Sequence, residues 1–201
     1  TGPVVPVAWW PDASALLLLH MVDGRHRMLR ADLASGTLTV LPTEPGSITA
    51  AAVRPDGEVW YRVHAGEHPA RLLAVGSDAA LLTPDGPLAP AGRPFEPWYF
   101  TNPHGQRVHG FLVRPEGDGP WSVMLRVHGG PYSTDTDRWA PDIQSHVDAG
   151  FLVAMVNYRG SEGFGAAWRD ALTGNVGFLE AEDVGAGLDD LVARGLADPA
   201  R

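Results

Sequence analysis

A pair of glycines that directly follows an apolar run is the part of this chain whose residue types could do chemistry. Residues 123–127 read Val-Met-Leu-Arg-Val, and His128, Gly129, Gly130 and Pro131 come next. A sharp turn after a buried strand leaves backbone N–H groups without partners, and such groups can stabilise the oxyanion that forms during acyl transfer. Pro131 has no N–H, so the two glycines are the candidate donors. The alternative interpretation is a tight strand-to-helix turn without a chemical role.

A second apolar run ends in a similar way. Residues 151–156 predict a buried strand, and residues 157–161 read Asn-Tyr-Arg-Gly-Ser. Because loops at the carboxyl ends of parallel strands meet at one edge of a sheet, we expect both polar stretches to lie there. Tyr158 and the many N–H donors of Arg159 are expected to brace this loop rather than to take part in chemistry. Tyr132 is expected either at the rim of the site or in the packing of its own loop.

Helices are predicted between and after these two runs. Pro141 and Asp142 suit the first turn of a helix that Gly150 would end. A second helix is predicted over residues 180–194, with acidic residues at its N-terminus, where the helix dipole favours negative charge. Its expected apolar stripe consists of Val184, Leu188, Leu191 and Val192. Such a helix should lead into a further parallel strand. Arg126 interrupts its apolar strand without an evident reason.

The first half of the chain predicts short β-strands at a regular spacing. Residues 4–83 form apolar segments separated by turn sequences such as Asp23-Gly24. Pro11 and Pro55 open corresponding turns 44 residues apart, which is the size of a four-stranded propeller blade. We therefore predict propeller-type blades, with two hairpin pairs of another all-β sheet as the alternative.

Composition changes between the two halves. Residues 84–97 are rich in proline and are predicted to be an extended linker. The predicted domains are therefore residues 1–83, the last blades of a β-propeller, and residues 98–201, part of an α/β domain.

Two short patterns resemble metal sites but lack the context that such sites need. Residues 64–68 follow the zinc-peptidase pattern H-x-x-E-H, which requires a helix, yet Gly66 lies inside the pattern and a predicted strand precedes it. A hairpin loop is predicted there instead. Residues 135–137 begin like a calcium loop, but Ala140 and His146 occupy its required Gly and Glu positions. The remaining histidines are expected to be structural or exposed: His20, His26, His104 and His109. We predict no metal and no other cofactor.

The composition excludes several kinds of partner. The 201 residues carry a net charge of −9 and no run of Lys or Arg, which argues against nucleic acid and membrane surfaces. No apolar run approaches the roughly 20 residues that a membrane span needs. The chain has no cysteine and no visible secretory signal, so a cytoplasmic location is expected.

The second half resembles the start of the catalytic domain of the prolyl oligopeptidase family, an α/β hydrolase, in its acylaminoacyl-peptidase and aminopeptidase branch. The matching motifs are residues 127–131, 157–161, 163–165 (Gly-Phe-Gly), 174–177 (Gly-Asn-Val-Gly) and 182–184 (Glu-Asp-Val). The first half resembles the family's β-propeller only in its strand pattern. The resemblance implies a serine peptidase that cleaves short peptides through an acyl-enzyme, with a propeller that restricts access. It also implies that Gly130 supplies an oxyanion N–H. The residues expected to line the site with it are His128, Gly129, Tyr132, Tyr158 and Arg159.

The resemblance also implies which groups are missing. The family's nucleophile, in a G-x-S-x-G turn, would follow Arg201, and its Asp and His would come later. No serine of this chain lies in such a motif, Ser133 and Ser161 included. We therefore expect an incomplete α/β hydrolase, inactive alone, whose partners are a short peptide substrate and the remainder of its own catalytic domain. A homo-oligomer is left open. The alternatives are a carboxylesterase of the same fold and a non-catalytic binding scaffold.

Overall fold

A computed structural model describes residues 2–82, 88–130 and 132–200 of the chain. The chain divides into two compact units. Unit 1 comprises Thr1–Ala91 and Thr136–Trp139, and unit 2 comprises Gly92–Asp135 and Ala140–Arg201. The predicted linker at residues 84–97 falls partly outside the described residues, and its last two residues belong to the first strand of unit 2.

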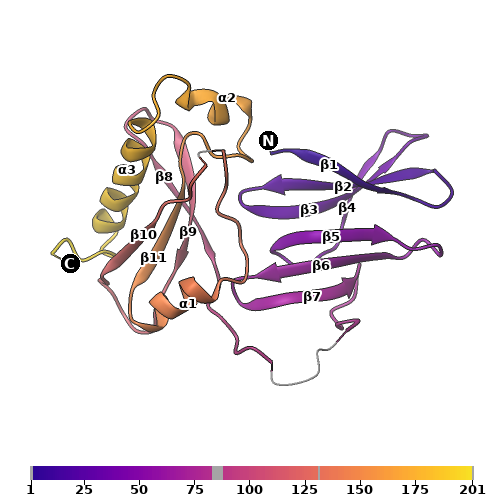
Figure 1. The fold of residues 1–201 in the computed structure, drawn as a ribbon, viewed down its shortest axis with the longest axis horizontal. Coiled ribbons are helices and arrows are strands. Elements are labelled where there is room, and N and C mark those ends of the chain that lie inside the picture. Colours follow the sequence, from indigo (N-terminus) through magenta and orange to yellow (C-terminus); the bar gives the residue numbers. More distant parts are fainter. Residues whose placement is uncertain (1, 83–87, 131, 201) are drawn as a thin grey trace. The chain divides into compact units, whose positions relative to one another are not determined.

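Unit 1 contains two antiparallel sheets, with strand orders β1-β2-β3-β4 and β5-β6-β7 (Figure 1). The strands of the first sheet are β1 (Val4–Trp9), β2 (Ala15–Val22), β3 (Arg25–Asp32) and β4 (Leu38–Leu41). Those of the second are β5 (Ser47–Val53), β6 (Val59–Ala65) and β7 (His68–Ala74). The β2–β3 turn confirms the hairpin prediction, since Asp23 and Gly24 both have the positive φ of a type I′ turn, 50° and 67°.

Residues 80–83 are the last apolar segment of the first half and predict a fourth strand of the second sheet. This prediction is wrong for the described residues 80–82. Leu81 N–H donates to Leu72 O at 2.8 Å, which is a single bond of a ladder. Leu82 is 69% exposed, so the segment has no apolar face to bury. Thr83 lies outside the described residues. Neither sheet closes into a barrel in the described part of unit 1, and the propeller stays a prediction.

One apolar core holds the two sheets of unit 1 together. Leu17 and Met28 of the first sheet share this core with Tyr61, Val63 and Leu73 of the second, and all of these side chains are buried. Apolar residues alternate along β6 because successive side chains of a strand point to opposite faces and one face of β6 is buried in this core.

Unit 1 also includes four residues from the second half of the chain. Asp137 is buried, and its carboxylate accepts hydrogen bonds from Arg25 Nε and from the Gly66 N–H, both at 2.8 Å. Its own N–H donates to Gly24 O at 2.9 Å. Gly66 lies in the β6–β7 turn, which confirms the hairpin predicted for residues 64–68.

Unit 2 is built on a four-stranded sheet with the order β10-β11-β9-β8. The strands are β8 (Glu96–Thr101), β9 (Arg107–Val113), β10 (Val123–Arg126) and β11 (Leu152–Asn157). β10 and β11 are parallel, whereas β9 pairs antiparallel with both β8 and β11. The two predicted polar loops therefore follow neighbouring parallel strands and leave the sheet at the same edge.

Helices cover both faces of this sheet (Figure 1). α1 (Pro141–Asp148) buries Ile143 and Val147 in one core with Met155, and α3 (Leu179–Ala193) buries Leu191 in the other core with Ala154. The short α2 (Ala166–Arg169) and the 3-10 turn Asp170–Leu172 connect β11 to α3. No helix in the described ranges is long and apolar enough to cross a membrane.

The buried side of α3 differs from the predicted apolar stripe. The buried residues are Asp183, Gly187 and Leu191, a row with a four-residue spacing, whereas Leu188 and Val192 are 38% and 37% exposed. Hydrophobicity alone misplaces the stripe because the row that faces the sheet includes a carboxylate and a glycine. After α3, Ala197 forms a parallel bridge with Trp121, next to β10.

Gly187 allows α3 to approach the sheet closely, which predicts opposite effects of alanine at two neighbouring glycines. A Cβ at Gly187 would lie 2.8 Å from Trp98 Cη2. Trp98 cannot retreat easily because it is buried and its Nε1 donates to Asp190 Oδ2 at 2.8 Å. Gly187→Ala should therefore lower the free energy of unfolding by about 1–3 kcal/mol. Gly185→Ala, whose Cβ would meet nothing within 4 Å, should raise it by up to about 1 kcal/mol. Urea denaturation measures both, and equal effects would contradict the close approach.

Two histidines of unit 1 predict a loss of stability in mild acid. Burial and the neighbouring His64 lower the pKa of His26 below 6.5, and burial and then Arg62 lower the pKa of His64. His26 Nδ1 also accepts the Ile48 N–H at 3.2 Å, a bond that protonation of Nδ1 would break. A lowered folded-state pKa contributes full stability above about pH 6.5 and less as the pH falls below it.

The unfolding free energy should therefore fall between pH 7 and pH 5.5. In His26→Asn, which keeps an acceptor near the Nδ1 position, urea denaturation should show a smaller fall. Equal falls in the two proteins would exclude His26 as a cause.

Candidate active site

Two loops meet at the carboxyl ends of β10 and β11. We call residues 127–135 the glycine loop and residues 157–164 the arginine loop; Pro131 of the glycine loop lies outside the described residues. The arginine loop is hydrogen-bonded to four residues of the glycine loop, His128, Ser133, Thr134 and Asp135. In the middle of the loop, the Glu162 N–H donates to Ser133 O at 2.9 Å, and the Thr134 hydroxyl donates to Glu162 O. The path of the glycine loop therefore depends on the arginine loop.

His128 is held on two sides at the start of the glycine loop. Its ring stacks on Tyr158 with a centroid distance of 4.3 Å and an angle of 18°. The Tyr158 hydroxyl donates to His128 O at 2.6 Å, and Ser161 Oγ lies 2.9 Å from His128 Nε2. Burial raises the pKa of the Tyr158 phenol, and the carboxylates of Glu180 and Asp135 raise it further, so the hydroxyl stays a donor at neutral pH.

Ser161 is a site residue that the sequence analysis missed. Its side chain is fully buried, and its oxygen is engaged by His128. In the sequence, Ser161 is considered only as a nucleophile, and it does not lie in the G-x-S-x-G motif that a nucleophile of this kind needs. The only sign of this role in the sequence is that Ser161 lies in the polar stretch that follows a predicted strand. Its hydrogen bond with His128 forms because the fold places the two loops side by side.

Gly130 occupies a conformation and a position that only glycine suits. Its φ is 136°, and a Cβ there would lie 2.9 Å from the Tyr132 N. Gly129 is different, since a Cβ on it would meet nothing within 4 Å. Both glycines are exposed, and within the described part of unit 2 neither N–H has a hydrogen-bond partner. Tyr132 is 52% exposed beside them, as a residue at a rim would be.

Arg159 braces the arginine loop against α3 through a buried carboxylate. Its Nε donates to Asp183 Oδ1 and Oδ2 at 3.1 and 3.0 Å, and its backbone N–H donates to Oδ2 at 2.7 Å. Asn102 Nδ2 donates to Asp183 Oδ1 at 2.9 Å, and Arg159 Nη2 also donates to Glu182 Oε2 at 2.9 Å. Burial lowers the pKa of Arg159, but the hydrogen bonds that it donates to the Asp183 and Glu182 carboxylates outweigh this and raise the pKa overall.

The sequence places Asp183 only among the acidic residues near the start of a helix and does not reveal its contact with Arg159. It is one of several acidic residues near the start of a helix, and helix-dipole stabilisation accounts for such residues in general. In the structure it is 0% exposed and satisfies both the side chain and the backbone of Arg159. The only sign of this role in the sequence is that Asp183 lies four residues before Gly187, which is the spacing of residues on one face of a helix.

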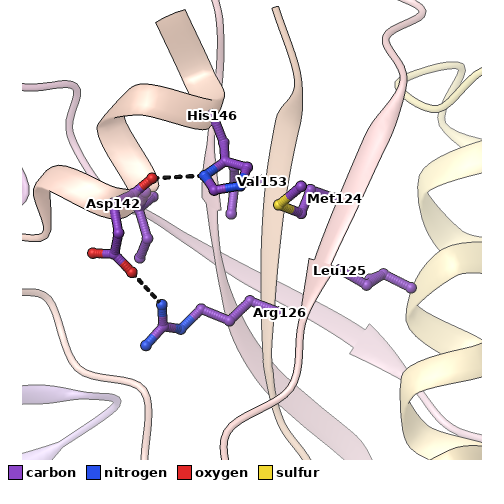
Figure 2. Close-up of a pocket in the computed structure, with 7 residues that line it drawn as sticks. Met124, Leu125, Arg126, Asp142, His146 and Val153 are labelled. Atoms are coloured by element: carbon purple, nitrogen blue, oxygen red, sulfur yellow. Dashed lines mark hydrogen bonds and ion pairs between the residues drawn. The ribbon is translucent and has the colours of Figure 1, made fainter. Parts of the chain in front are cut away.

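Arg126, which the sequence leaves unexplained, joins β10 to the start of α1. Its Nη1 donates to Asp142 Oδ2 at 2.8 Å, and its Nε lies 3.6 Å from Asp135 Oδ1. Burial raises the pKa of Asp142, but the bond from Arg126 outweighs this and lowers the pKa overall. Figure 2 shows the Arg126 side chain reaching from its strand to Asp142. The pocket of about 190 Å³ beside it is lined by Met124, Leu125, Arg126, Asp142, Ile143, His146 and Val153.

The glycine loop presents exposed backbone N–H groups, which are the kind of donor that can bind an anionic oxygen, and hydrogen bonds tie it to the arginine loop. Within the described residues no group of three His, Asp or Glu side chains could hold a metal ion. The other expected site residues, His128, Tyr132, Tyr158 and Arg159, all lie on the two loops or brace them.

The model of the prolyl oligopeptidase family matches residues 138–201. The part of the second unit that this match covers, from Ala140 onward, therefore belongs to that family. The match covers α1, β11 and α3, and with them Tyr158, Arg159 and Asp183; it begins after Gly130.

Individual peptidases are similar to this chain over longer stretches. The chain is 26% identical over 160 residues to dipeptidyl-peptidase 5 of Schizosaccharomyces pombe, which covers 75% of this chain and 23% of that protein. A puromycin-hydrolyzing peptidase of Mycobacterium tuberculosis is 27% identical with a TM-score of 0.76, over 98% of this chain and 32% of that chain. An acylaminoacyl peptidase in complex with Z-Gly-Gly-Phe-chloromethyl ketone has the same fold, with a TM-score of 0.77 at 20% identity over 94% of this chain and 31% of that chain. The chain therefore spans about a quarter to a third of the length of these proteins.

The buried Arg159–Asp183 pair predicts a large effect of a substitution that keeps the charge. Arg159→Lys should lower the free energy of unfolding by about 2–3 kcal/mol, because lysine cannot replace the two-pronged contact and leaves a buried carboxylate short of donors. The matched control is Arg169→Lys, since Arg169 pairs with Asp170 on the surface, where both side chains are about half exposed. Urea denaturation should show no change for the control. Equal stability of the two variants would contradict the bracing role.

Proposed function

We propose that this chain forms the oxyanion-loop part of a serine peptidase that cleaves short peptides, of the acylaminoacyl-peptidase or aminopeptidase type. The observation that carries the proposal is the exposed N–H of Gly130, which has no hydrogen-bond partner among the described residues of unit 2, in a loop held by a half-buried hydrogen bond at its start and a buried one at its end. The match of residues 138–201 to the prolyl oligopeptidase family supports the reaction class. The nucleophilic serine and its Asp and His partners would lie in residues outside this chain.

The proposed role of Gly130 follows from the charge that develops in acyl transfer. When a serine attacks a peptide carbonyl, the carbonyl oxygen becomes an oxyanion in the tetrahedral intermediate. A preorganised N–H donor stabilises this charge more than it stabilises the neutral substrate, and the loss of one donor costs roughly 3–4 kcal/mol of the activation barrier. His128, Tyr158 and Ser161 would act by keeping the loop in place, because their hydrogen bonds lie at its start.

We also propose that the two sheets of unit 1 are blades of a β-propeller. Their packing through a shared apolar core supports this, since propeller blades stack face to face. The other face of the first sheet also carries an apolar cross-strand row, Leu18, Leu29 and Val40, of which Val40 is 61% exposed. A row of this kind suits the packing of a further blade.

The proposal predicts different effects of alanine at the two glycines. In the enzyme that contains this chain, Gly130→Ala should lower kcat for an aminoacyl anilide by about 10²–10³, because the new Cβ clashes with the Tyr132 backbone and displaces the N–H donor. Gly129→Ala keeps its N–H and meets no atom, so its kcat should stay within a few-fold of the parent. The rate of labelling by a fluorophosphonate probe should follow the same order.

The same measurements separate the alternatives. A parent enzyme that turns over simple esters but not anilides would favour a carboxylesterase. A protein that the fluorophosphonate does not label would favour a binding scaffold. Equal activity of the Gly129 and Gly130 variants would remove Gly130 as the donor.

A further inference from the structure

We propose that His109, which lies outside both loops, is a positioning residue for the glycine loop. It would act by fixing the amide orientation of Asn157, which in turn clamps the backbone of Asp135. This inference rests on the proposed function, since the glycine loop matters for catalysis only if Gly130 is an oxyanion donor.

The first step is the clamp at the end of the glycine loop. Asn157 is the last residue of β11 and its side chain is fully buried. Its Oδ1 accepts the Asp135 N–H at 2.8 Å, and its Nδ2 donates to Asp135 O at 3.0 Å. One side chain therefore binds both backbone groups of one residue. Asp135 is itself buried, so this end of the loop is held where water cannot replace the bonds.

The second step is the orientation of the Asn157 amide. A backbone N–H can only donate, so the amide oxygen must face the Asp135 N–H and the amide nitrogen must face the other way. The nitrogen has two hydrogens. One goes to Asp135 O, and His109 Nδ1 lies 3.0 Å from Nδ2 in the direction of the other.

The third step assigns the tautomer of His109. The amide nitrogen has no lone pair to offer, so Nδ1 must accept and the ring proton must lie on Nε2. The backbone register brings the two residues together, because His109 on β9 pairs directly with Asn157 on β11. The ring cannot turn freely, since it packs against Tyr99, Phe111 and Phe164 at centroid distances of 5.3, 4.8 and 5.4 Å.

The fourth step connects the clamp to Gly130. The glycine loop is tied at its start through His128 and at its end through Asp135, with Gly130 between the two ties. If the His109 acceptor is lost, one amide hydrogen of Asn157 is left among apolar side chains without an acceptor. The orientation of the Asn157 amide, which binds Asp135, is then less strongly fixed. A displacement of about 1 Å at a catalytic donor can lower a rate by about 10²-fold.

The test compares three substitutions in the full enzyme that contains this chain. His109→Asn places an amide oxygen near the Nδ1 position and keeps the acceptor, whereas His109→Leu has none and His109→Gln places its amide at the Nε2 position. We expect kcat of the Leu and Gln variants to fall about tenfold with KM within twofold, and the Asn variant to keep kcat within threefold. Hydrogen exchange mass spectrometry of residues 133–139 should show faster exchange in the Leu and Gln variants and parent-like exchange in the Asn variant.

The exchange measurement separates the clamp from the proposed function. Parent-like exchange in both the Leu and Gln variants, or an Asn variant as impaired as the Leu variant, would overturn the positioning role. A parent enzyme that a fluorophosphonate does not label would overturn the proposed function and the catalytic consequence of the clamp, while exchange at residues 133–139 would still decide whether His109 orders the loop. If the Leu variant does not fold, the Gln variant carries the same comparison.

Discussion

The hydrogen bonds between the glycine loop and the arginine loop are the constraint on which the candidate site of unit 2 depends. The glycine loop presents exposed backbone at Gly129 and Gly130 and has little side-chain packing of its own there. Ordering such a segment costs conformational entropy at every residue, so its order must come from contacts elsewhere. Those contacts come from the arginine loop, and they exist because β10 and β11 are parallel neighbours whose ends leave the sheet together.

The buried Arg159–Asp183 pair extends this constraint from the loops to a helix. A buried ion pair does not stabilise a fold efficiently, because the cost of removing two charges from water offsets much of their attraction. The pair instead fixes the orientation of the arginine loop relative to α3. Asp183 accepts from both the backbone and the side chain of Arg159, so the arginine loop has one position relative to α3. Asn102 donates to the same carboxylate and adds the β8–β9 hairpin to the arrangement.

Most elements of this fold are predictable from local patterns. The strands of both units, the hairpin at Asp23 and Gly24, and the helix predicted over residues 180–194 follow from apolar periodicity and turn residues, which act over a few positions. The predictions that fail depend on distant partners. Residues 80–82 have the composition of a strand, but their apolar side chains are exposed rather than buried against a partner. The buried side of α3 differs from the predicted apolar stripe because Gly187 and Asp183 face the sheet.

The sequence by itself determined the glycine turn after an apolar strand and the two candidate N–H donors in it, because these are read from residue type and spacing along a few neighbouring positions. Its motifs also carry the resemblance to the prolyl oligopeptidase family, which the family model matches over residues 138–201. Only the tertiary structure decided the partners of the polar residues: Ser161 with His128, Asp183 with Arg159, Arg126 with Asp142, and His109 with Asn157. A side chain that hydrogen-bonds across a sheet or between loops carries no periodic signal. Its partner is set by strand order and register, which bring together residues 16 to 48 positions apart in these pairs.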